Sequence, residues 1–164
     1  MKTLGKIFLY VPLFAFLLLS CSSSNEDDPE DVLLKIGDFP ISELAGNWEV
    51  TQAQFSVNTV SVDVVQDGGT ASMTVQSNGR FTLTLDPVDR AAYTVSGEMF
   101  WEKWEQAFFF AIVWDTYPDD WDTYGHTWDG TTFTINGGPD TGEYDFDNDG
   151  DAEPCTLHFT FVRP

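Results

Sequence analysis

The residues with the clearest capacity for chemistry are the carboxylates of an acidic segment near the C-terminus. Counted from Asp145, carboxylates stand at positions 1, 3 and 5 and a glycine at position 6, the order in which a tight loop wraps oxygen ligands around calcium. Position 12, where a helix-flanked calcium loop has a bidentate glutamate, is Thr156. The segment therefore predicts either a weak calcium site or a solvated acidic hairpin. The candidate metal ligands are Asp145, Asp147, Asp149, Asp151 and Glu153.

A second candidate site is a small repeat of tryptophan and aspartate. Trp114-Asp115-Thr116-Tyr117 recurs as Trp121-Asp122-Thr123-Tyr124, and Trp128 follows at the same spacing. Pro118 and Gly125 interrupt the repeat, which predicts a loop. Aromatic rings stack on sugar faces and carboxylates accept from hydroxyls, so the repeat indicates either a glycan site or rings that pack over one end of the domain. The candidate glycan ligands are Trp114, Trp121, Tyr124 and Trp128.

Residues for catalysis do not form a recognisable set. His126 and His158 stand in different contexts without a nucleophile motif nearby. Carboxylate pairs such as Glu102 with Glu105 arise freely in so acidic a chain. Cys155 is expected to be a packed small residue. The sequence therefore predicts a protein that is not an enzyme.

The N-terminus reads as an export and anchoring signal. Lys2 and Lys6 precede an apolar run, residues 7–19, which is shorter than the roughly 20 residues that a membrane span needs. The end of this run and the two residues after it, Leu18-Leu19-Ser20-Cys21, resemble the lipobox of bacterial lipoproteins. The resemblance implies a signal peptide at 1–20 and diacylation (palmitate or similar chains) of Cys21, which then anchors the protein to a membrane.

A polar, acidic stretch follows the cysteine and predicts a flexible tether, so that residues 21–40 form the anchor and tether and residues 41–164 the folded domain. Ser22 after the cysteine and the acidic run resemble the sorting signals of lipoproteins of the outer membrane, on the cell surface rather than on the periplasmic face. This localisation is an expectation from the resemblance.

Composition limits the partners. The chain has 164 residues with 27 Asp and Glu against 7 Lys and Arg, a formal net charge of −20. Such a chain repels phosphate backbones, which excludes a nucleic-acid partner, and it repels anionic lipid, so that membrane attachment depends on the covalent anchor. A hydrophobic fraction of 42 % and an aromatic fraction of 15 % predict a folded domain with a substantial core.

The elements that position these residues are predicted by alternation of apolar and polar residues, the period of a half-buried strand. The alternating segments are 48–51, 71–75, 81–85, 93–97, 132–135 and 157–161. Asn78-Gly79 between two of them predicts a hairpin turn with positive φ. About eight short antiparallel strands predict an all-β domain, either an up-and-down barrel or a β-sandwich.

Residues 107–114 are apolar on both faces. Either this strand is buried on both sides, under the segment around Leu33 and Ile36, or its outer aromatics (Phe108, Phe110, Ile112) are exposed for a partner.

The stretch Leu44-Ala45-Gly46-Asn47-Trp48 resembles the start of lipocalins, and the ending Phe159-Thr160-Phe161-Val162-Arg163 resembles their last strand. Asn78 to Phe81 and Tyr93 to Gly97 are similar to strand-turn units of lipocalin-like domains in bacterial lipoproteins. The resemblance implies an eight-stranded up-and-down barrel, closed at one end, that holds one small apolar ligand and has no catalytic activity. Parity of the first and last strands predicts that Arg163 stacks on Trp48.

Three functions are compatible with these features. The first is a lipocalin-like lipoprotein that binds a small hydrophobic or amphipathic ligand. The second is a surface module that binds glycan with calcium as a structural aid. The third is an accessory lipoprotein of an envelope complex. An open barrel interior favours the first, a row of exposed tryptophans the second, and a filled barrel with an exposed aromatic stripe the third.

Overall fold

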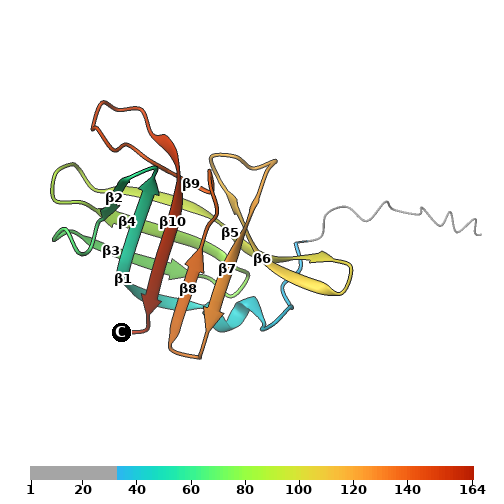
Figure 1. The fold of residues 1–164 in the computed structure, drawn as a ribbon. Helices are drawn as coiled ribbons and strands as arrows, with labels where there is room; N and C mark the ends of the chain where they lie inside the picture. The colour runs from blue at the N-terminus through green and yellow to red at the C-terminus, as the bar shows by residue number, and fades with distance from the viewer. Residues whose placement is uncertain (1–32) are drawn as a thin grey trace, which may run out of the picture. The chain divides into compact units, whose positions relative to one another are not determined.

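The computed structural model describes residues 33–164 (Figure 1). Cys21, the predicted signal peptide and most of the predicted tether lie outside the described residues. Within the described range, no helix is both long and apolar enough to cross a membrane.

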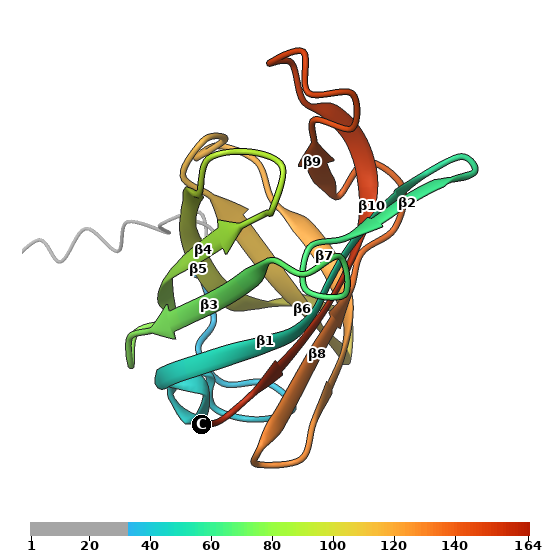
Figure 2. The ribbon, with the colours of Figure 1, turned by 90° about the vertical axis from the view of Figure 1, so that its left-hand side faces the viewer.

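The described chain is built from antiparallel strands and one short 3₁₀ helix, η1 (Ile41–Leu44). Eight strands pair in sequence around a closed barrel, because β1 and β10 are hydrogen-bonded to each other (Figure 2). The predicted up-and-down barrel is therefore confirmed, and the alternative of a β-sandwich is wrong. The strands are β1 (Gly46–Val57), β2 (Val60–Asp63), β3 (Thr70–Val75), β4 (Arg80–Asp86), β5 (Tyr93–Trp104), β6 (Ala107–Trp114), β7 (Asp122–Trp128), β8 (Thr132–Asn136), β9 (Gly142–Tyr144) and β10 (Glu153–Val162).

Three of the ten strands, β2, β7 and β9, were not predicted as strands. β2 pairs with the second half of β1, and β9 pairs with the first half of β10. Both are short ribbons that extend one end of the barrel wall beyond the eight-stranded ring (Figure 2). That end carries the longer loops and is called the mouth.

The residues that face the barrel interior are those that the alternation of apolar and polar residues predicts. In β4, Phe81, Leu83 and Leu85 are buried, whereas Thr82 between them is exposed. In β10 the same period buries every second residue from Cys155 to Phe161. Burying apolar side chains on one face of each strand supplies the main driving force for closing the sheet.

The end opposite the mouth is closed by aromatic side chains. Trp48 is 2 % exposed, and its indole N–H donates to the carbonyl of Leu44 in η1 at 2.8 Å. The Arg163 guanidinium carbon lies 4.5 Å from the centroid of the Trp48 ring, the contact that strand parity predicts. Arg163 also donates to the carbonyls of Ala45 and Glu43, so it ties the end of the last strand to η1.

The asparagine-glycine turn differs from the prediction in detail. β3 and β4 form the predicted hairpin, but Gly79 alone has positive φ, at +90°. The hairpin loop is longer than two residues, because the N–H of Gln76 donates to the carbonyl of Arg80 at 2.8 Å. Asn78 instead accepts the Arg80 N–H with its side chain at 3.0 Å.

The chain before the barrel packs against it, so the tether does not extend to residue 40 as predicted. Leu34 forms a bridge with Trp101 of β5, and the Phe39 ring lies 5.0 Å from the Trp101 ring, edge to face. Lys35 pairs with Glu98 at 2.5 Å. Phe39 also packs against Trp128 at the closed end, so this part of the chain is held to the barrel.

The strand that is apolar on both faces is buried on both sides over only part of its length. Phe110 and Ile112 face the core, and Ala111 on the other face is also buried. The segment around Leu33 and Ile36, which was expected to cover this strand, instead pairs with the adjacent strand β5, where Leu34 bridges Trp101, and Ile36 is 72 % exposed. The predicted outer stripe is wrong too, since Phe110 and Ile112 are buried and Phe108 is half-buried.

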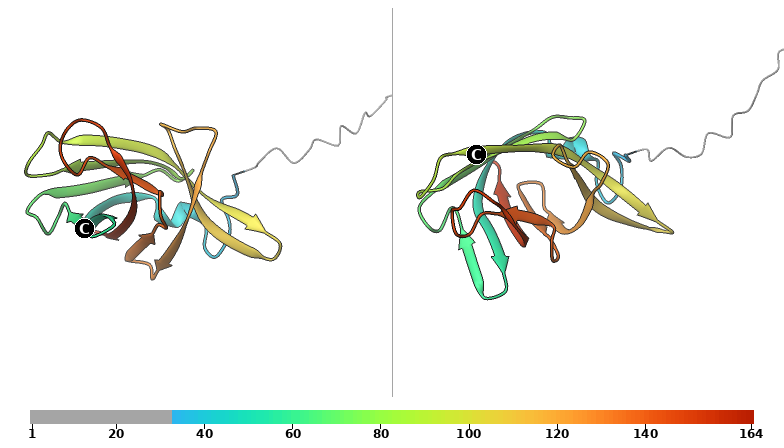
Figure 3. Two further views of the ribbon diagram at one scale, coloured as in Figure 1. Left: turned by 45° about the horizontal axis from the view of Figure 1, so that its top comes forward. Right: turned by 90° about the horizontal axis from the view of Figure 1, so that it is seen from above.

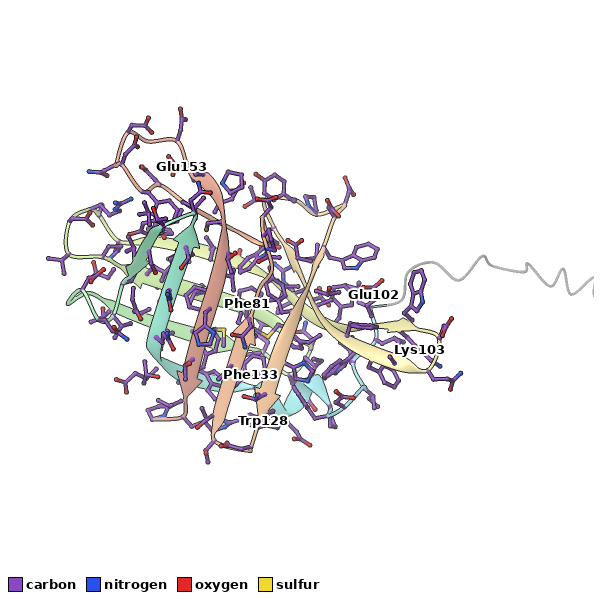
Figure 4. The ribbon with its side chains drawn as sticks, in the orientation of Figure 1. Phe81, Glu102, Lys103, Trp128, Phe133 and Glu153 are labelled. Atoms are coloured by element: carbon purple, nitrogen blue, oxygen red, sulfur yellow. The ribbon has the colours of Figure 1, made fainter. Side chains whose placement is uncertain are left out.

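The β5–β6 hairpin extends past the barrel wall, as Figure 3 shows from two sides, and Lys103 and Glu102 near its tip are labelled in Figure 4. Trp104 at the tip is 67 % exposed and Phe109 is 45 % exposed. The exposed aromatics of strand β6 are therefore confined to this tip, which projects beyond its neighbouring strands.

Candidate ligand cavity and acidic loop

A cavity of about 320 Å³ lies inside the barrel at the mouth. Its floor and walls are apolar, because alternate residues of β1, β4, β5 and β10 point into the barrel above the aromatic plug. The wall residues are Phe55, Leu83, Leu85, Tyr93, Val95, Leu157 and Phe159. The barrel is therefore packed at one end and hollow at the other.

Aromatic residues from the β6–β7 region form one side of the mouth. Trp114 and Trp121 line the cavity, and the Trp121 ring lies 6.0 Å from that of Phe100. Tyr124 is buried behind them; its hydroxyl accepts from the Trp114 indole N–H at 3.0 Å and donates to the Thr141 carbonyl at 2.8 Å. These bonds join the β6–β7 side of the mouth to the loop before β9. Burial raises the pKa of Tyr124, so its hydroxyl keeps the proton that it donates.

A second link crosses the mouth between two loops. The hydroxyl of Tyr117, which follows β6, donates to Glu143 of β9 at 2.8 Å. This hydrogen bond raises the pKa of Tyr117, and the negative charge of Glu143 acts in the same direction. Because Tyr117 is 52 % exposed, the link sits at the solvent edge of the cavity.

Four carboxylates line the cavity: Asp120, Asp122, Asp140 and Glu143. No lysine, arginine or histidine is among the lining residues, and within residues 33–164 none of the four carboxylates takes part in a salt bridge. Burial, and then the charge of Asp120, raises the pKa of Asp122. The mouth is thus apolar inside and negatively charged at its rim.

The predicted tryptophan-aspartate site is divided between the two ends of the barrel. Trp114 and Trp121 lie at the mouth with Tyr124 behind them, but Trp128 lies at the closed end (Figure 4). The Trp128 ring is 5.6 Å from the Trp48 ring, and its indole N–H donates to Glu43 at 3.1 Å. The prediction of a loop throughout the repeat is wrong, because the second copy runs along strand β7.

The remaining cavity residues were not predicted to form a site. The alternating segments place Leu83, Leu85, Val95, Leu157 and Phe159 inside the domain, but alternation does not indicate which level of a barrel stays hollow. Asp140 and Glu143 were missed because they follow a Gly-Pro loop that gives no chemical signal. The abundance of aspartate throughout the chain masked Asp120.

The histidines and the buried cysteine lie outside the cavity. His126 packs against the Trp101 ring at 5.0 Å, with Nε2 3.5 Å from an Asp38 carboxylate oxygen. His158 is next to Asn136. Burial raises the pKa of Cys155 to about 11, so its thiol is a poor nucleophile at neutral pH.

The acidic loop brings three of its five predicted ligands together. Oxygen atoms from Asp145, Asp147 and Asp149 lie within 4.8 Å of one another, whereas Asp151 is outside this group and Glu153 accepts the Phe146 N–H at 3.0 Å. Glu153 is labelled at the base of the loop in Figure 4. The three clustered carboxylates are suitable oxygen donors for calcium.

Part of the charge in this loop is already balanced. Asp145 accepts the backbone N–H groups of Asp149 and Gly150 at 3.1 and 3.0 Å. Arg90 Nη1 lies 3.9 Å from an Asp145 carboxylate oxygen and donates to the Asp145 carbonyl at 2.5 Å. A neighbouring guanidinium lowers the affinity of a carboxylate group for a cation, so any calcium site here is expected to be weak.

We predict that calcium binds this loop and raises the melting temperature. Calcium at about ten times its dissociation constant stabilises by about 1.4 kcal/mol, which corresponds to a few degrees for a domain of this size. Asp147→Ala should abolish the rise. The matched control is Asp151→Ala, which removes a carboxylate from the same loop but outside the cluster. If the melting temperature in millimolar calcium equals that in NaCl at the same ionic strength, the prediction of a calcium site is wrong.

Comparison of the chain with protein-family models, with curated proteins and with solved structures finds no match.

Proposed function

We propose that the protein is a lipid-anchored, non-enzymatic lipoprotein of the bacterial cell envelope that binds a small hydrophobic or amphipathic molecule in its barrel. The observation that carries the proposal is the cavity of about 320 Å³ at one end of a barrel whose other end is plugged. A concave, mostly apolar space with a few polar groups is the usual form of a small-molecule site. Calcium in the acidic loop and a glycan partner are separate proposals.

The two other functions have weaker support. A glycan platform needs neighbouring rings on one surface, and Trp128 lies too far from Trp121 to share one. An accessory role in an envelope complex is supported only by the exposed tip of the β5–β6 hairpin, where Trp104 and Phe109 are accessible. The cavity is the more specific feature, because it combines apolar walls with a charged rim.

The proposal is tested by titrating the protein with N-phenyl-1-naphthylamine, a neutral apolar fluorophore that brightens in apolar surroundings. The expected result is saturable binding of one molecule per chain. An absence of saturable binding would overturn the proposed function.

The anchor is tested separately. Cys21→Ser removes the thiol that takes the diacylglycerol, so the variant is expected to leave the membrane fraction. Cys155→Ser is the matched control, because this buried cysteine in β10 has no role in anchoring and its variant should stay with the membranes. The measurement is the distribution of both proteins between soluble and membrane fractions of the producing bacterium. If Cys21→Ser fractionates like the unaltered protein, the anchor is elsewhere.

A further inference from the structure

We infer that the ligand of the barrel cavity carries a positive charge: an ammonium or quaternary ammonium group on a small apolar body. This inference rests on the proposed function and adds the chemical class of the ligand. It depends on the arrangement of charge around the cavity.

The rim is negative, and none of the lining residues offsets it. Asp120, Asp122, Asp140 and Glu143 contribute four carboxylates, and no basic residue is among the lining residues. Elsewhere in the described chain carboxylates do pair with cations, as Asp115 does with Arg80 at 2.7 Å and Glu98 with Lys35 at 2.5 Å. The rim therefore repels an anionic head group and attracts a cationic one.

Aromatic faces complement the charge. Trp114, Tyr117 and Trp121 line the same cavity as the carboxylates. The face of an indole or phenol ring attracts a cation, and the attraction increases where water is excluded. A cationic head at the rim would thus lie among carboxylates and aromatic rings, while its apolar body would contact Leu83, Leu157 and the other wall residues.

The spacing of the carboxylates favours an organic cation over a metal ion. Within residues 33–164, three carboxylate, histidine or cysteine ligand atoms approach within 4.8 Å of one another only in the acidic loop around Asp147. The rim carboxylates do not meet this condition, so they do not form a cage for one small ion. A broad ammonium group with its charge spread over several carbons suits a wide rim better.

Asp122 is the rim carboxylate whose substitution tests the inference most directly. Asp122 is half-buried at the start of β7, and its pKa is raised by burial and by Asp120. Its ionised form is thus less stable than that of an exposed aspartate, and a bound cation relieves this cost. Asp122→Asn removes the charge and keeps the shape of the side chain, so the variant is expected to fold.

The test compares three molecules with the same tail: octyltrimethylammonium, 1-octanol and octyl sulfate. The two ionic molecules are kept below their micellar concentrations, and the alcohol is kept below its solubility limit. Their dissociation constants are measured by displacement of N-phenyl-1-naphthylamine. We expect the cation to bind about tenfold more tightly than the alcohol and the sulfate to bind most weakly. Added NaCl should weaken binding of the cation more than binding of the alcohol.

Variants distinguish the contribution of the rim carboxylates to cation binding from the contribution of the net charge of the chain. Asp122→Asn is expected to lower the affinity for octyltrimethylammonium about three- to tenfold. The double variant Asp120→Asn/Asp122→Asn should lower it further, whereas the affinity for octanol should change less. Asp119→Asn is the matched control: it removes the same charge from the turn just before β7, but Asp119 does not line the cavity. If Asp119→Asn lowers the affinity for the cation as much as Asp122→Asn does, the attraction comes from the net charge of the whole chain and the inference is overturned.

Acidification gives an independent readout, because octyltrimethylammonium does not titrate. The groups that share the cavity with Asp122 are Asp120, Asp140, Glu143, Tyr93 and Tyr117. The ionised rim binds the cation better, so affinity should be full above the raised pKa of Asp122 and fall as the pH drops through it. Octanol should show a smaller change over the same range.

The outcomes distinguish the inference from the proposed function. If all three molecules bind equally, the cavity binds ligands and the charge inference is wrong. If octyl sulfate binds most tightly, the inference is also wrong. If the probe and all three molecules fail to bind, the proposed function itself fails.

Discussion

Replacing Trp48 with alanine is expected to lower the free energy of unfolding by about 3–5 kcal/mol, the range for truncating a large buried aromatic side chain. Trp48 is 2 % exposed, contacts the Trp128 ring edge to face at 5.6 Å, and donates a hydrogen bond to Leu44. The change would remove the plug of the closed end and the ring on which Arg163 lies. The measurement is equilibrium unfolding in urea, with the slope compared between variants.

The matched control is Trp104→Ala, at the tip of the β5–β6 hairpin. Trp104 is 67 % exposed, so the same truncation should cost about 0.5 kcal/mol or less. The loss in free energy of unfolding for Arg163→Ala should fall between the two. A cation–π contact contributes about 0.5–2 kcal/mol, and its contribution increases with the degree of desolvation. Equal costs for Trp48→Ala and Trp104→Ala would contradict the role of Trp48 as the plug.

Filling the cavity is expected to abolish ligand binding. Val95 of β5 lines the cavity and is half-buried, so Val95→Trp places a large ring in the space of about 320 Å³. We expect the affinity for N-phenyl-1-naphthylamine to fall by about tenfold or more, since the ring displaces the probe from its apolar contacts. Binding is measured by fluorescence titration and folding by circular dichroism.

The neighbouring residue provides the control for this change. Thr94 points to the outside of the same strand and is exposed, so Thr94→Trp adds the same ring outside the barrel. It should leave binding unchanged. If Val95→Trp fails to fold, Leu157→Phe is the milder filling of the same cavity. Unchanged affinity in a folded, filled variant would place the probe elsewhere.

Much of the fold could be predicted because a barrel strand has one buried face. Leu83 in β4 and Phe159 in β10 are buried as alternation predicts, and Trp48 and Arg163 identify the strands that close the ring. The prediction was poorer for residues 97–114. There β5 extends to Trp104 and forms a long hairpin with β6, and apolar residues on both faces conceal the alternation on which strand prediction depends.

The candidate site was only partly predictable, for a reason of geometry. Trp121 and Trp128 are seven residues apart in sequence, and strand β7 between them spans about 3.3 Å per residue. An extended strand therefore carries the two rings to opposite ends of the barrel, whereas in a loop they could meet. The rim carboxylates lie on either side of strand β8 in the sequence. The antiparallel β7–β8 hairpin returns the chain to the mouth, and this pairing brings Asp122 and Asp140 to one cavity.

The central claim is that the hollow end of the barrel is a ligand site. The most direct measurement is the set of nuclear Overhauser effects between bound N-phenyl-1-naphthylamine and the methyl groups of the protein. The account predicts contacts to Leu83, Val95 and Leu157, which line the cavity. Contacts confined to Ile36, Val60 and Val88, whose exposed methyl groups lie outside the cavity, would contradict it.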